Sequence, residues 1–132
     1  MITDLNNLIR LDDSQSKAAA DVLARAFQDD PLFVYFFPNA FQRMNNLPRI
    51  FRYVVHRGVL YGEVYATSTN LEGVVVWLPS EKVLMSRRPI VRPAAFLRML
   101  KMGAGSIRRM MRFSPYATAM HKRHAPFRHW YL

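Results

Sequence analysis

The stretch from residue 61 to residue 79 constrains the fold most, because it predicts two β-strands joined by a tight turn. Its first part is rich in β-branched and aromatic residues, and the turn is supplied by Thr69, Asn70, Glu72 and Gly73. Residues 74–78 form an unbroken apolar run, which is typical of a strand covered on both faces. Pro79 has no N–H to donate, so the second strand should end there. We expect the flanking helices to pack against this hairpin.

The segment before the hairpin predicts a short strand followed by helices. Residues 6–11 can form the strand. Asp13 or Ser14 then caps a first helix, whose apolar residues have helical spacing and which ends near residue 29. Asp30, followed by a proline, has the pattern of a cap and a first helical position.

A longer amphipathic helix is predicted to lead into the hairpin. Asn39 and Gln42 have the spacing of a capping box, and apolar residues at helical spacing continue to Leu60. Pro48 lies inside this pattern, so the helix either bends there or begins there. After the hairpin, residues 80–93 predict a polar connector.

The last third of the chain predicts two helices and the start of a strand. Residues 94–113 form the first helix, with Gly103 and Gly105 near its middle as a point of close packing or bending. Residues 114–124 form a shorter helix, and residues 129–132 begin an aromatic strand. We therefore expect residues 1–132 to be a single α+β domain that is incomplete, because the sequence stops as a fourth strand begins.

Composition excludes several classes of protein. The chain has no cysteine, so disulfides, thiol nucleophiles and thiolate metal sites are absent. Its N-terminus lacks the pattern of a signal peptide, and no apolar run approaches the roughly 18 residues of a membrane span. We expect a cytoplasmic protein.

Charge is divided unequally along the chain. Residues 1–81 hold 7 basic and 9 acidic residues, whereas residues 82–132 hold 12 basic residues and no acidic one. This asymmetry predicts an anionic partner for the second half, such as a phosphorylated cofactor, a nucleic acid, an acidic lipid or an acidic protein segment.

The order of these elements resembles the GNAT superfamily of acyl-CoA-dependent N-acetyltransferases, in particular a bacterial group with a helical insertion after the third strand. Four segments carry the resemblance and span nearly the whole chain: Ala-Phe-Gln-Asp-Asp-Pro at 26–31, Tyr-Gly-Glu-Val-Tyr-Ala at 61–66, Val-Val-Val-Trp-Leu-Pro at 74–79 and His-Trp-Tyr-Leu at 129–132. The resemblance implies a GNAT-like three-layer α/β fold in which a short antiparallel sheet packs against four to five helices.

The resemblance also implies acetyl-CoA as acyl donor and an amine of a small molecule or peptide as acceptor. In the superfamily, a turn of the type Gln/Arg-x-x-Gly-x-Gly/Ala opens a helix after the fourth strand and binds the pyrophosphate of acetyl-CoA. The five glycines of this sequence form no such turn. We therefore expect no cofactor-binding residues in this chain, no tight binding of acetyl-CoA, and no acetyl transfer by these residues alone.

Three residues are candidates for binding the acceptor. In GNAT-like folds the end of the third strand lies near the substrate groove, so Trp77 is a candidate wall, although ordinary core packing is the favoured explanation. Phe27 and Asp30 lie at the junction that shapes the acceptor site in such folds. The Asp30 carboxylate would attract a cationic amine, while helix capping is the simpler explanation.

Two residues on the predicted second strand are candidates for proton transfer. Acetylation of an amine requires a base for the amine and an acid for the leaving thiolate. Glu63 and Tyr65 have the right chemistry, but a one-residue change of register would turn both to the other face, and Tyr65 also suits simple packing. His121, His124 and His129 lack a further ligand nearby, so no metal site is predicted.

The predicted helix at 94–113 has a basic face. Arg98, Lys101, Arg108, Arg109 and Arg112 fall within one arc of roughly 100°. Three interpretations remain open: a solvated face, an electrostatic attraction for CoA phosphates, or a non-enzymatic basic module that binds nucleic acid or an anionic surface without specific sequence recognition. An unpaired edge at the third strand would also favour a homodimer.

Overall fold

The computed structural model describes residues 7–85, 97 and 100–132, and these residues form a mixed fold of helices and strands. The α+β prediction is therefore confirmed. In chain order the elements are β1 (Ile9–Arg10), the 3-10 turn η2 (Asp13–Gln15), α1 (Ser16–Ala26), α2 (Pro31–Phe36), α3 (Ala40–Tyr61), β2 (Glu63–Ala66), β3 (Val74–Pro79), α4 (Ser80–Met85), α6 (Ala104–His124) and β4 (Trp130–Tyr131).

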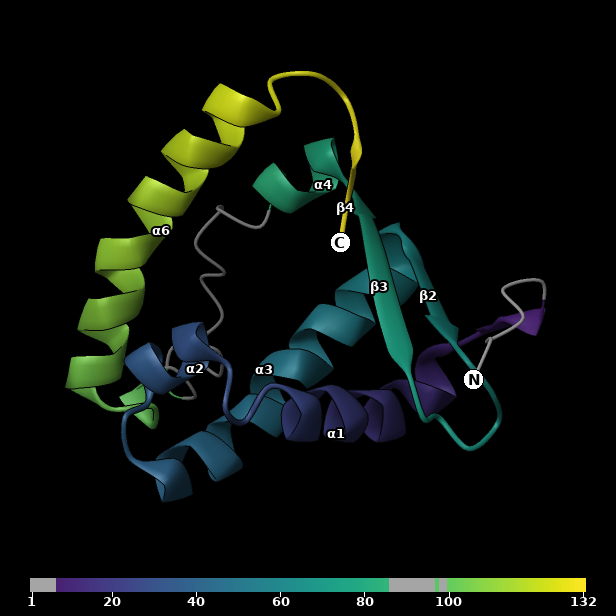
Figure 1. The fold of residues 1–132 in the computed structure, drawn as a ribbon, viewed down its shortest axis with the longest axis horizontal. Coiled ribbons are helices and arrows are strands. Elements are labelled where there is room, and N and C mark those ends of the chain that lie inside the picture. The colour runs from purple at the N-terminus through teal and green to yellow at the C-terminus, as the bar shows by residue number, and fades with distance from the viewer. Residues whose placement is uncertain (1–6, 86–96, 98–99) are drawn as a thin grey trace.

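The strands form one antiparallel sheet in the order β1-β2-β3-β4 (Figure 1). The predicted hairpin is present, with Glu63 opposite Trp77 and Ala66 opposite Val74. Strand β3 ends at Pro79, as the missing N–H predicts. The terminal strand β4 pairs only with the last two residues of β3.

Helices α1 and α3 cover one face of this sheet (Figure 1). Val64 and Ala66 of β2 face them and pack into a core with Leu47 and Val55 of α3. Gly58 of α3 permits this close approach, because a Cβ there would lie 2.5 Å from Val76 Cγ1. The core of the molecule therefore lies between α1, α3 and the sheet.

The prediction that residues 74–78 are covered on both faces is wrong. Every residue of β3 is only half-buried. Val74 and Val76 pack against the core, whereas Val75 and Trp77 alternate to the opposite face. The apolar run therefore has one covered face, and on its other face Val75 and Trp77 stand opposite Tyr65 and Glu63 of β2.

Side-chain caps mark the starts of α2 and α3. Asp30 Oδ1 accepts a hydrogen bond from Leu32 N at 2.9 Å, and Asn39 Oδ1 accepts one from Gln42 N at 3.0 Å. The first start differs from the prediction, because Asp12 forms the capping box and a 3-10 turn precedes α1. Helix α3 continues through Pro48.

The second half departs further from the prediction. Residues 80–85, expected as connector, form α4, and α6 is one helix that continues through Pro115 instead of two that meet there. Gly103 precedes α6 with φ +89°, a conformation that suits glycine, so this residue marks a helix start. The rest of the predicted helix at 94–96 and 98–99 lies outside the described residues.

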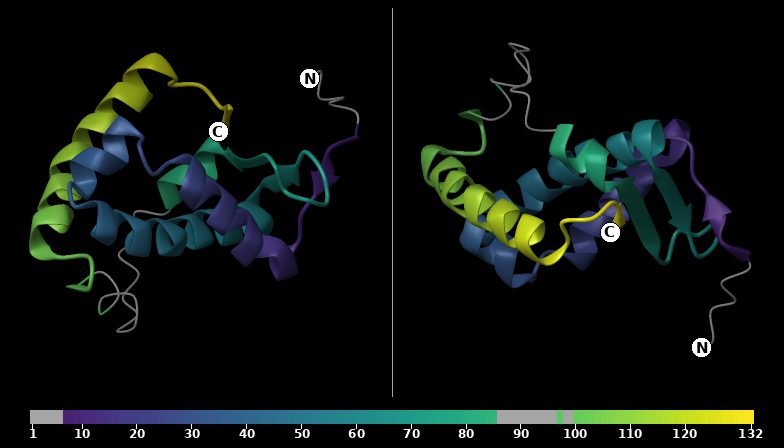
Figure 2. Two further views of the ribbon diagram at one scale, coloured as in Figure 1. Left: turned by 60° about the horizontal axis from the view of Figure 1, so that its bottom comes forward. Right: turned by 90° about the horizontal axis from the view of Figure 1, so that it is seen from above.

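Helix α6 lies at the periphery of the molecule and packs on α2 (Figure 2). Arg109 Nε and Nη2 donate to the carbonyl oxygen of Phe36, at 3.1 and 3.0 Å. The rings of Phe113 and Phe36 meet edge to face with centroids 5.6 Å apart. In the described part of the chain, no helix is long and apolar enough to cross a membrane.

Candidate functional site

The sheet face that α1 and α3 leave uncovered carries a group of polar and aromatic side chains. Val64 and Ala66 point into the core, so Glu63 and Tyr65 alternate to the other face. Trp77 stands opposite Glu63 and Arg10 stands opposite Tyr65, which places all four side chains on this face. We call Arg10, Glu63, Tyr65 and Trp77 the open-face cluster.

Two contacts organise the open-face cluster. The Tyr65 hydroxyl donates to Glu63 Oε2 at 2.9 Å. Arg10 Nη2 lies 3.9 Å from the other carboxylate oxygen, Glu63 Oε1. The Glu63 side chain is 37% exposed, so a ligand in solvent can reach it.

The hydrogen bond has an electrostatic consequence for the phenol. The carboxylate of Glu63 accepts a hydrogen bond from the Tyr65 hydroxyl, and this bond, together with desolvation and the negative charge of Glu63, raises the pKa of Tyr65. Like any tyrosine, Tyr65 is protonated at neutral pH, and it serves as a donor; the raised pKa extends this state to higher pH. Glu63 keeps Oε1 available to accept a hydrogen bond or a proton.

The other two predicted residues lie apart from this cluster. Asp30 uses its carboxylate to cap α2. Phe27 packs on Phe33 and Phe51, with ring centroids 5.9 and 5.1 Å apart, on the helical side of the sheet. The structure thus brings Glu63, Tyr65 and Trp77 together and places Phe27 and Asp30 on the far side of the sheet.

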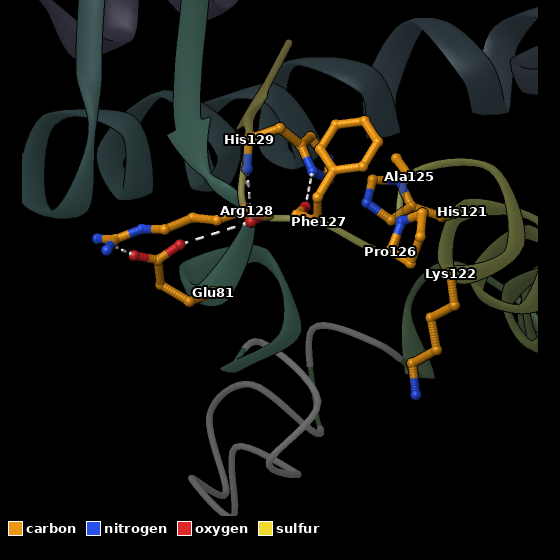
Figure 3. A pocket seen from close by; sticks show the side chains of 9 residues that line it. Glu81, His121, Lys122, Ala125, Pro126, Phe127, Arg128 and His129 are labelled. Atoms are coloured by element: carbon orange, nitrogen blue, oxygen red, sulfur yellow. Dashed lines mark hydrogen bonds and ion pairs between the residues drawn. The ribbon is translucent and has the colours of Figure 1, made fainter.

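A cavity of about 710 Å3 opens between α4, the C-terminal end of α6 and the chain that enters β4 (Figure 3). On one side Arg128 Nη2 pairs with Glu81 Oε1 at 2.7 Å. A hydrogen bond from its own backbone N–H and the adjacent Arg128 lower the pKa of Glu81. On the other side the rings of His121 and His129 lie 4.8 Å apart.

His129 is held by backbone contacts at the edge of this cavity. Its N–H donates to Ser80 Oγ at 3.2 Å, and its carbonyl accepts from Ser80 N at 2.8 Å. The ring Nδ1 donates to the carbonyl of Phe127 at 2.6 Å (Figure 3). Nε2 is fully covered and has no hydrogen-bond partner among the described atoms, so it offers nothing to a ligand in the cavity.

Metal binding receives no support from the described residues, since no three His, Asp or Glu side chains converge there. The sequence interpretation missed Arg10, although the alternation in Ile9-Arg10-Leu11 places it on the face opposite its apolar neighbours. It also placed Arg109 on the basic face of a helix, whereas Arg109 contacts α2.

Comparisons with models of protein families, with curated proteins and with solved structures find no match to this chain.

Proposed function

We propose that this chain forms the acceptor side of a GNAT-like N-acetyltransferase and binds a primary amine of a small molecule or peptide. Two features support the proposal. Helices separate β1 from β2, a hairpin follows, and further helices precede β4, in the order implied by the sequence resemblance. The antiparallel order β1-β2-β3-β4 agrees with the same scheme.

The observation that carries the proposal is the Glu63–Tyr65 pair beside Trp77. A cationic amine would place its N–H groups on Glu63 Oε1 and its alkyl chain or charge against the indole of Trp77. Glu63 would then accept a proton from the bound ammonium, since a free amine is needed for attack on an acyl group. Tyr65 would hold the second carboxylate oxygen in place.

Acetyl-CoA does not fit the residues present. No Gly-rich turn of the family type occurs in the sequence. Among the described helices, α6 begins after Gly103 with no side-chain cap, and its first turn carries no adjacent glycine cluster of that pattern. We therefore propose that this chain binds the amine acceptor. We assign it no step that requires bound acetyl-CoA.

Amine binding is tested by NMR titration of the protein with N-acetyl-lysine amide. We expect shifts in the amides of β2 and β3 that saturate in the millimolar range, and a loss of at least tenfold in affinity for Glu63→Gln. Glu72→Gln is the matched control, because it removes the same charge at the turn end of the same hairpin. Equal effects of the two substitutions would count against the proposal.

The assignment of the donor is tested separately by calorimetry with acetyl-CoA. We expect no binding tighter than millimolar to the 132-residue chain. A micromolar dissociation constant would show that these residues hold the donor by a route other than the Gly-rich turn.

A further inference from the structure

Helix α6 presents basic side chains to solvent near both of its ends. Arg108, Arg112, Lys122 and Arg123 are all exposed, and at 100° per residue they fall in one arc on the side of the helix that faces away from α2. We call these four residues the basic arc. Two views agree that α6 stands at the outer edge of the molecule (Figure 1 and Figure 2).

Among the described residues, no acidic side chain forms an ion pair with the basic arc. The sequence from Lys82 to the last residue contains no Asp or Glu. The ion pairs formed by the described residues join Arg10 to Glu63, His56 to Asp13 and Arg128 to Glu81, and none uses a residue of α6. The charges of the arc therefore repel one another in the isolated protein, and an anionic partner would relieve that repulsion.

We propose that the basic arc is a binding surface for the phosphate backbone of nucleic acid, contacted without base recognition. Residues 108–123 span about 22 Å of helix, the length of about six nucleotides of one strand of a duplex. Three of the four cations are arginine, whose planar guanidinium binds phosphate in a bidentate manner. The structure thus offers up to four phosphate contacts along one helix, two near each end of the basic arc.

The arrangement of apolar residues on α6 favours nucleic acid over an anionic membrane. A helix that binds at a bilayer surface turns its apolar face toward the lipid. In α6 that face, which includes Ile107, Met110 and Phe113, is half-buried and turned toward the rest of the fold. The exposed apolar residues Met111 and Tyr116 lie on opposite margins of the basic arc. If one of them were inserted into a bilayer, the other would point away from it.

The test is fluorescence anisotropy with a labelled 20-base-pair DNA of mixed sequence at several salt concentrations. Four neutralised phosphates predict a slope of log K against log salt of about −3.6 for a duplex and about −2.8 for a single strand. The double variant Arg108→Gln with Arg112→Gln should reduce the magnitude of the duplex slope by about 1.8. Affinity should vary little between DNA sequences.

A matched control removes two exposed cations outside α6, Lys17→Gln with Arg49→Gln, at the same cost in net charge. We expect it to leave the slope unchanged, and circular dichroism should show that both double variants remain folded. The proposal is overturned if DNA does not bind at low salt, if both variants lose the same slope, or if vesicles of phosphatidylserine and phosphatidylcholine bind tighter than DNA through the same arginines. Glu63 lies on the sheet and not on α6, so the variant Glu63→Gln should bind DNA as the unaltered protein does. This result would distinguish failure of the DNA-binding proposal from failure of the amine-binding proposal.

Discussion

At the scale of single residues, hydrogen bonds decide what each ionisable group can do. Glu63 and Arg109 are both half-buried charged side chains, yet Glu63 is accessible to a ligand whereas Arg109 holds two helices together. Glu63 has one oxygen on Tyr65 and the other oriented toward Arg10 and solvent. Arg109 uses two of its N–H groups on a single carbonyl. Side-chain chemistry alone would not distinguish these roles.

The raised pKa of Tyr65 predicts a pH dependence. An isolated phenol ionises near pH 10, and in the folded protein Tyr65 should ionise at higher pH. Between these two values the folded state binds more protons than the unfolded state, so the contribution of Tyr65 is complete below about pH 10 and is lost as pH rises through the folded pKa. Near-ultraviolet titration of tyrosinate measures the shift.

The control for this titration is Tyr65→Phe, which should remove the late-ionising step. Glu63→Gln should move that step back toward pH 10, because the carboxylate that accepts the phenolic proton is gone. A late step that persists unchanged in Glu63→Gln would contradict the assignment.

At the scale of elements, α6 is attached to the rest of the fold at few points. Its docking on α2 rests on Arg109 and on the contact between Phe113 and Phe36. The carbonyl of Phe36 belongs to the last residue of α2, where the helix leaves its final carbonyls without intrahelical partners. Arg109 therefore donates hydrogen bonds to a carbonyl oxygen that has no partner within α2.

We expect Arg109→Met to lower the free energy of unfolding by about 1–3 kcal/mol, the usual cost of removing a charged partner from a half-buried acceptor. The aliphatic stem is retained, so the loss reports mainly on the two hydrogen bonds. Urea denaturation at equilibrium measures it. Arg108→Gln, one residue away and exposed, should change stability by less than about 0.5 kcal/mol, and equal losses in the two variants would refute the docking role.

Elements specified by local chemistry were predictable from the sequence. The hairpin, its end at Pro79 and the caps at Asp30 and Asn39 depend on neighbours within a few residues, and the structure confirms them. The division of residues 104–124 into two helices was wrong, because Pro115 is tolerated inside α6 and Gly103 starts the helix instead of bending it.

The face on which a side chain lies was harder to predict than whether a segment is a helix or a strand. A strand shifted by one residue reverses its faces, so only the pairing with β1 and β3 shows that Glu63, Tyr65 and Trp77 share the uncovered side. Likewise Arg108 and Arg109 are adjacent in sequence, yet Arg108 is exposed and Arg109 contacts α2. The position of α2 decides this difference. Contacts between distant segments decide both points, and no local pattern encodes them.

At the scale of the whole molecule, the sheet has an incomplete edge. Strand β4 pairs with Leu78 and Pro79, so residues 74–77 of β3 have no strand on that side within the described part of the chain. Exposed backbone donors and acceptors on such an edge favour pairing with another chain. We therefore propose that the protein forms a homodimer through this edge.

Light scattering coupled to size exclusion tests the dimer at several protein concentrations. We expect a dimeric mass at micromolar concentration and a monomeric mass for Val75→Lys, since a charge at this position disfavours edge pairing. Ala18→Lys adds the same charge at an exposed position of α1 and should leave the dimer intact. A monomeric mass for the unaltered protein at all concentrations would exclude this interface.

The pairing of Ser80 with His129 closes a loop across 49 positions of the chain. The two ends of that stretch are held together by the two-residue ladder between β3 and β4 and by two hydrogen bonds between Ser80 and His129. Ser80 also follows β3 directly and begins α4. One residue therefore joins the end of the central hairpin, the start of a helix and the C-terminal segment of the chain.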